Sequence, residues 1–124
     1  MDGVRLVRSE ERTENSPTPG MIREQALHTD GLWAGVAHTD PGAVSGWHHH
    51  GEYESTIYIL TGAMRMEFGP DGGDSLDAEP GDFIYIAPHE IHREGNPSGA
   101  PGSAVVVRAG RGEPVFNVDG PSPG

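Results

Sequence analysis

Short runs of β-branched and aromatic residues recur roughly every ten residues along this chain, with turn-forming residues between them. Asp40-Pro41-Gly42 and Pro80-Gly81-Asp82 are two of these separators, and both are typical of tight turns. No window of about twelve residues has a helical period of apolar side chains. The pattern is that of a many-stranded antiparallel domain, and we expect strands at 21–28, 32–39, 44–50, 55–61, 63–68, 75–78, 82–87 and 104–109.

The length of 124 residues suits one domain, in which strands this short form a sandwich or a small barrel, with a jelly roll among the leading options. Residues 1–20 are charged and Pro-rich, and we interpret them as an arm with a short strand near 4–8. Residues 21–109 form the predicted barrel. The remainder, 110–124, has a candidate edge strand at 114–118 and a Pro/Gly-rich end.

The charge balance limits the classes of partner that this chain is expected to bind. All eight basic residues are Arg, and nineteen acidic residues bring the net charge to −11. Phosphate backbones and anionic lipids repel such a chain, so we expect no nucleic-acid partner and no membrane partner. Without Cys or Lys, the chain can form no disulfide, thiolate metal site or Schiff base. The longest apolar runs are too short to span a bilayer, the first residues do not resemble a signal peptide, and we expect a cytoplasmic protein.

Candidate metal ligands lie in two segments. In a strand, side chains two residues apart share a face, so His48 and His50 project together while His49 points the other way. Glu54 follows closely, and two imidazoles with a carboxylate can coordinate a divalent metal. The alternative is that these residues form an exposed polar patch. The second segment, 80–96, contains a turn, a buried strand and then His92, with His89 as a competing ligand within a second turn.

Together these segments resemble the paired motifs of the cupin superfamily. The first motif, G-x5-H-x-H-x3-E, is met by Gly42, His48, His50 and Glu54. The second, G-x5-P-x-G-x2-H-x3-N, is met by Gly81, His92 and Asn96, with Ala87 and His89 in place of the motif Pro and Gly. The resemblance implies an all-β fold, a cupin-type double-stranded β-helix, or jelly-roll barrel, preceded by the N-terminal arm.

The resemblance also implies one divalent metal held by His48, His50, Glu54 and His92. Fe(II) is favoured, and Mn(II), Ni(II), Cu(II) or Zn(II) would also suit these donors. Seven residues separate Glu54 from Gly62 where the family has six, so a site of three His without a carboxylate remains an alternative. At His89, a residue other than Gly must adopt a backbone conformation that Gly adopts more readily.

The function implied by the family is that of a metal enzyme acting on a small organic substrate, most readily a dioxygenase-type oxidoreductase. The alternatives are a metal-dependent isomerase, lyase or polyketide-type cyclase, and a binding module without turnover. No catalytic residue is assigned. Arg65 and Arg93 are candidates for holding a substrate carboxylate, although surface charge is the more ordinary interpretation. Candidate pocket residues, for which core packing is the alternative, are Tyr58, Met64, Met66, Phe83 and His89.

We also expect a homodimer. The arm and the edge strand bury little against so small a barrel, and an unpaired strand edge invites pairing with a second copy.

Overall fold

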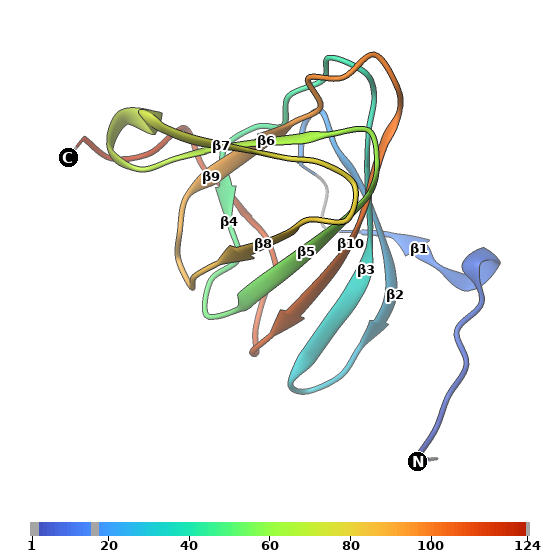
Figure 1. Ribbon diagram of the computed structural model, residues 1–124. Helices are drawn as coiled ribbons and strands as arrows, with labels where there is room; N and C mark the ends of the chain where they lie inside the picture. The colour runs from blue at the N-terminus through green and yellow to red at the C-terminus, as the bar shows by residue number, and fades with distance from the viewer. Residues whose placement is uncertain (1–2, 16–17, 124) are drawn as a thin grey trace.

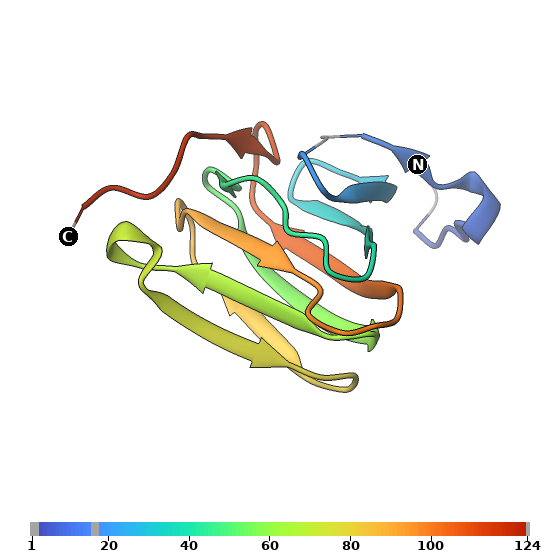
Figure 2. The ribbon, with the colours of Figure 1, turned by 90° about the horizontal axis from the view of Figure 1, so that it is seen from above.

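A computed structural model describes residues 3–15 and 18–123 as two antiparallel sheets that face each other (Figures 1 and 2). The larger sheet has the strand order β1 (Thr13–Glu14), β2 (Ile22–His28), β3 (Leu32–Thr39), β10 (Gly102–Ala109), β5 (Glu54–Thr61) and β8 (Phe83–Ile86). The smaller sheet has the order β11 (Phe116–Asn117), β4 (His48–His49), β9 (His92–Gly95), β6 (Met64–Phe68) and β7 (Asp74–Ala78). Several neighbouring strands, such as β3 and β10 or β4 and β9, are distant in the chain, as in a double-stranded β-helix, and the all-β prediction is confirmed.

Alternation along the strands builds the core between the sheets. Every second residue of β3 and β10, and of β5 as far as Ile59, is buried, and the sheets close over a cluster that includes Ile57, Ile59 and Val106. β6 adds Met64 and Met66 from the opposite sheet, with exposed fractions of 5% and 2%. The two methionines therefore belong to the hydrophobic core between the sheets.

The predicted and observed strands differ in three places. Residues 4–8 are not a strand; within the arm, the described residues contain a 3-10 turn at Ser9–Glu11 and then β1. The strand expected at 44–50 is reduced to His48–His49, with an isolated bridge between Val44 and Gly95. The strand β9 was not predicted, because its four residues directly follow a turn and are too few for a period to be recognised. Residues 16–17 of the arm lie outside the described residues.

The outer face of the larger sheet is unusually apolar. Residues paired across β3, β10, β5 and β8 form a continuous row of Val36, Val105, Tyr58 and Phe83. The Phe83 side chain is 71% exposed and its ring lies 4.7 Å from that of Tyr58. Tyr58 and Phe83 therefore lie outside the barrel rather than lining an internal pocket.

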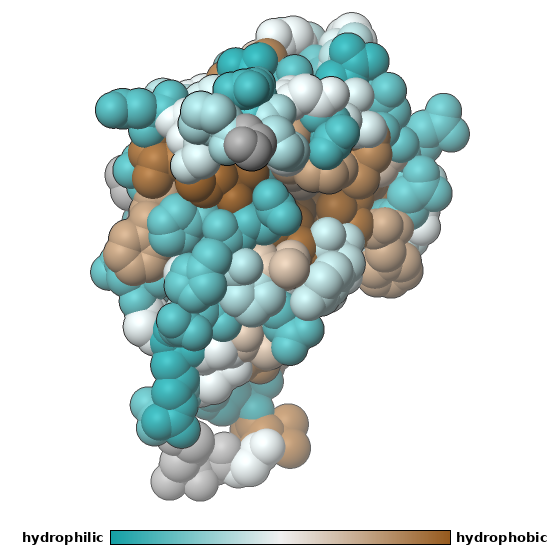
Figure 3. Space-filling model, turned by 90° about the vertical axis from the view of Figure 1, so that its left-hand side faces the viewer, coloured by the Kyte–Doolittle hydropathy of each residue, from teal (hydrophilic) through white to brown (hydrophobic). Residues whose placement is uncertain are grey.

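The side of the molecule shown in Figure 3 has a different character: much of it is hydrophilic, with apolar side chains gathered in a recessed area near the centre. Among the described residues, no helix has the length and apolar character needed to cross a membrane.

Candidate metal centre

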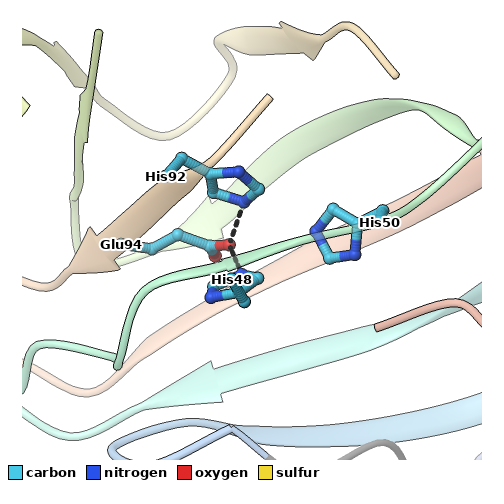
Figure 4. Close-up of side chains that lie close together, drawn as sticks. All are labelled: His48, His50, His92 and Glu94. Atoms are coloured by element: carbon cyan, nitrogen blue, oxygen red, sulfur yellow. Dashed lines mark hydrogen bonds and ion pairs between the residues drawn. The ribbon is translucent and has the colours of Figure 1, made fainter. Parts of the chain in front are cut away.

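Four potential ligands converge on the inner surface of the smaller sheet. His48 and His50 come from β4 and the residue beyond it, and β9 places His92 and Glu94, two residues apart, on one face (Figure 4). His48 pairs directly with His92 across the two strands. One nitrogen from each imidazole and one carboxylate oxygen all lie within 4.8 Å of one another. The exposed fractions of the imidazoles are 0%, 3% and 1% for His48, His50 and His92, so the site is shielded from solvent.

Backbone carbonyls orient all three imidazoles. The Nδ1 atoms of His48, His50 and His92 donate to the carbonyl oxygens of Gly46, Pro114 and Glu90, at 2.9, 2.7 and 2.8 Å. A carbonyl oxygen only accepts, so each Nδ1 carries the hydrogen, and Nε2 of a neutral ring keeps its lone pair. Metal-binding histidines are commonly oriented in this way by an acceptor on the other ring nitrogen.

The spacing of the donors suits a metal ion. Glu94 Oε1 lies 3.1 Å from Nε2 of His48 and 3.2 Å from Nε2 of His92. Adjacent ligands of an octahedral ion with bonds of about 2.1 Å are separated by about 3 Å. Lone pairs and a carboxylate this close repel each other unless a proton or a cation lies among them. The donor set therefore fits a cation.

Burial favours a metal ion over protons in this role. Burial is the main reason that the pKa of His48 is lowered, and the nearby Glu94 carboxylate only partly offsets it. The pKa of His50 lies well below its usual value, first through burial and then through the positive charge of Arg108. Burial alone would raise the pKa of Glu94, but its polar contacts with His48 and His92 outweigh burial and lower it well below its usual value. Burial thus favours the neutral imidazoles of His48 and His50 and the contacts favour an ionised Glu94, the forms that bind metal.

The prediction for the fourth ligand was wrong in its placement. Glu54 is an exposed residue at the start of β5, on the outer face of the other sheet, where its carboxylate contacts Tyr85. Strand alternation explains this, because the neighbouring Ser55 points inward and Glu54 must therefore point outward. Glu94 occupies the corner expected for Glu54. The sequence signal for Glu94 is its position two residues after His92, which identifies the shared face only if 92–95 is known to be a strand.

The other candidate site residues lie outside the cluster. His89 is an exposed turn residue whose Nε2 lies 3.1 Å from Glu52 Oε1, and its φ of 62° is the conformation anticipated where the motif has Gly. Arg65 and Arg93 pair with Asp77 and Glu67 on the outside of the smaller sheet. Neither arginine is therefore placed to hold a substrate at this centre.

Two different arginines are buried beside the centre. Arg23, from β2, is 2% exposed, and its Nη2 lies 3.0 Å from His48 Nε2 while Nη1 donates to Thr18 Oγ1. Arg108, from β10, is also 2% exposed, and its guanidinium stacks on Trp33 at 4.3 Å from the ring centroid. Sequence reasoning singled out neither of them.

Comparison with known proteins agrees with this arrangement. The family described as "Cupin domain" matches residues 35–108, more than half of the chain and including His48, His50, His92 and Glu94. This chain belongs to the cupin family. A search of curated proteins found no match to this cupin.

Solved structures share the fold of this cupin. A conserved protein with a double-stranded β-helix domain from Klebsiella pneumoniae is 23% identical, with a TM-score of 0.75 and coverage of 93% of this chain and 97% of that one. KdgF from Halomonas sp. is 23% identical, with a TM-score of 0.71 and coverage of 87% and 96%. The polyketide cyclase RemF from Streptomyces resistomycificus is 24% identical, with a TM-score of 0.73 and coverage of 93% and 85%.

Proposed function

We propose that this cupin is a mononuclear divalent-metal enzyme that acts on a small organic substrate. One nitrogen from each of three buried imidazoles and one buried carboxylate oxygen lie within 4.8 Å of one another, and every Nδ1 hydrogen is committed to a backbone carbonyl; this arrangement carries the proposal. His48, His50, His92 and Glu94 would hold the metal. A divalent metal bound there would supply Lewis-acid chemistry and, if redox-active, electron transfer.

The chain itself would orient and shield the reaction. The carbonyls of Gly46, Pro114 and Glu90 fix the three rings, and the two sheets exclude water from their Nε2 atoms. The guanidinium of Arg23 lies against His48 and places a positive charge beside the ligand cluster. An oxyanion that develops on a bound substrate would be stabilised in such an environment, because fixed charges act strongly where water is excluded.

The first candidate reaction is a dioxygenase-type oxidation with Fe(II). Three imidazoles and one carboxylate occupy four positions of an octahedral ion, which would leave room for a chelating substrate, or for a substrate and O₂. The dioxygenase remains the prediction made from the family resemblance, and the set of three imidazoles and one carboxylate supports it.

The second candidate is a reaction without net oxidation, an isomerisation, elimination or cyclisation. Its specific support is the similarity in fold to a polyketide cyclase over 93% of this chain. In such a reaction the metal would act only as a Lewis acid. A binding module without turnover is the third possibility, and the same experiment tests it.

The deciding experiment begins with metal-free protein to which Fe(II), Mn(II) or Zn(II) is added back. Each form is assayed with a panel of diketones, phenols and thiols, with oxygen uptake and substrate consumption measured in parallel. Oxygen uptake with Fe(II) alone supports the dioxygenase. Substrate consumption without oxygen uptake, with Zn(II) as well, supports the second candidate. Tight metal binding without turnover of any compound would contradict both enzyme candidates.

A pair of adjacent histidines supplies the matched control. His50→Ala removes an inward-pointing imidazole, whereas His49→Ala removes a half-buried ring that stacks on Phe116 at 5.0 Å, away from the cluster. Metal content and turnover should fall in the first variant and stay near wild type in the second. Equal losses in both variants would argue against the assignment of the centre.

We also propose that the chain forms a homodimer through the outer face of the larger sheet. The exposed Phe83 and Tyr85 lie on this face beside the half-buried Tyr58, Val105 and Val107. A two-fold axis through this face would bring the apolar row of each copy against that of the other.

A further inference from the structure

Arg108 has a buried guanidinium with unused hydrogen-bonding capacity. The residue is 2% exposed, and among the described side chains its Nε and Nη1 atoms are two of the few buried polar atoms without a hydrogen-bond partner. The Trp33 ring packs on one face of the guanidinium. The N–H groups point outward in the plane of the guanidinium, so the stacked ring does not accept their hydrogen bonds. Burying a charged group whose hydrogen-bond donors have no acceptors is energetically unfavourable, unless another group or a ligand accepts those hydrogen bonds.

Ser55 is a second incomplete group next to Arg108. The two residues are directly paired across β5 and β10, and both side chains point into the barrel. Side chains paired in this way have Cβ atoms about 5 Å apart. Ser55 is 3% exposed, and its hydroxyl also has no partner among the described residues. The unpartnered guanidinium nitrogens and the unpartnered hydroxyl therefore belong to directly paired residues that face the same interior.

The charges around these groups favour an anion. Arg23 and Arg108 are both buried in the barrel, whereas the only buried carboxylate among the described residues is that of Glu94. Glu94 is already held among the imidazoles, and a divalent metal would add further positive charge. The positive charge of Arg108 acts on both His50 and Glu94, which places Arg108 within electrostatic range of the metal centre.

We infer that Arg108 and Ser55 form an anion subsite that binds a carboxylate of the substrate beside the metal centre. The inference rests on the proposed function and names its substrate class: a small organic acid with a second oxygen that can reach the metal. The carboxylate accepts hydrogen bonds from the Ser55 hydroxyl and from one of the two unpartnered Arg108 N–H groups, Nε or Nη1, which lie on different edges of the guanidinium. Arginine suits this task, because its guanidinium stays charged and forms charge-assisted hydrogen bonds to carboxylate oxygens.

Trp33 provides a direct readout of binding at Arg108. The chain has two tryptophans, so Trp47→Phe leaves Trp33, which is stacked on Arg108, as the only source of indole fluorescence. In this background, malonate is titrated into the Zn(II)-loaded protein and into the metal-free protein, with malonamide as the neutral probe of similar shape. Zn(II) binding is measured separately by calorimetry.

Malonate should change the Trp33 emission saturably, and malonamide should bind at least about tenfold more weakly, because charge-assisted hydrogen bonds are lost. Arg108→Gln should weaken malonate binding at least about tenfold, and Ser55→Ala should weaken it by a smaller factor. Arg93→Gln is the matched control, because it removes an arginine that lies outside the barrel, against the ring at position 47. It should leave the malonate affinity unchanged.

The outcomes separate this inference from the proposed function. Zn(II) binding without a malonate response, or equal binding of malonate and malonamide, overturns the anion subsite and leaves the metal centre standing. A malonate response that needs Arg108, in a chain that binds no metal, supports the subsite and contradicts the metal enzyme. If Arg108→Gln fails to fold, Ser55→Ala still tests the inference, since it leaves every charge in place. Wild-type malonate affinity in both Ser55→Ala and a folded Arg108→Gln would overturn the inference.

Discussion

At the scale of single residues, the same side chain has different roles according to the face on which it lies. Glu54 and Glu94 are chemically identical, yet Glu54 faces outward and Glu94 is 3% exposed among three imidazoles. Arg93 and Arg108 each stack on a tryptophan, yet Arg93 pairs with Glu67 and Arg108 has no carboxylate partner within hydrogen-bonding distance among the described residues. Residue type indicates what chemistry is available, and burial decides where it is used.

The assignment of Glu94 leads to a direct test. Glu94→Gln should weaken divalent-metal binding at least about tenfold, because it removes the single negative charge of the donor set. Glu54→Gln is the matched control and should leave the metal affinity unchanged, since its carboxylate lies on the outer surface. Calorimetric titration with Zn(II) measures both variants. A large loss for Glu54→Gln with none for Glu94→Gln would restore the original prediction.

At the scale of elements, the larger sheet depends on close contact between β2 and β3. Gly35 lies in β3, where the pairing with β2 shifts register between Gln25 and Leu27. A Cβ atom at Gly35 would lie 2.2 Å from the Glu24 carbonyl oxygen and 2.7 Å from the Trp33 ring. Since Trp33 supports Arg108, this contact also bears on the proposed subsite.

Substitution at Gly35 should therefore destabilise the sheet. Gly35→Ala should lower the free energy of unfolding by about 1–3 kcal/mol, because the backbone of β2 must move to admit the methyl group. Gly31→Ala is the control, since no atom lies within 4 Å of the Cβ it would add. Urea unfolding followed by circular dichroism measures both. Equal stability of the two variants would show that β2 and β3 separate without cost.

At the scale of the whole molecule, the apolar outer face of the larger sheet and the exposed arm both bear on assembly. Val4 and Leu6 in the arm are 90% and 70% exposed, and Phe83 on the outer face is 71% exposed. The apolar side chains gathered on the outer face of the larger sheet, Phe83 among them, are typical of an interface. The homodimer remains a prediction, as does the cytoplasmic location.

The oligomeric state can be measured by light scattering. The chain has a mass of 13.2 kDa, so a homodimer should give about twice that value. Phe83→Glu should shift the mass toward the monomer, because it places a charge in the apolar row of both copies. Leu76→Glu, on the other sheet at 37% exposure, should leave the dimer intact. A wild-type mass of one chain over a wide concentration range would rule the dimer out.

Local patterns in the sequence determined the all-β class, most of the strands and three of the four residues of the candidate metal cluster. His48 and His50 could be assigned to one face because alternation is a property of the strand itself, and His92 followed from its spacing in the second motif. Local sequence patterns could not decide whether Glu54 or Glu94 lies beside the three imidazoles. It depended on which face of β5 points inward, and on a four-residue strand that is defined by its pairing with β4 and β6.

Only the tertiary structure could reveal Arg108. The residues before it, Val105, Val106 and Val107, are apolar on both faces of β10, so alternation alone does not say which face is the interior. Pairing with β3 and β5 places Arg108 opposite Trp33 and Ser55, inside the barrel. The sequence by itself determined which chemical groups were available, because strand period and motif spacing are short-range properties. The tertiary structure decided which of them meet, because burial depends on how two sheets close over each other.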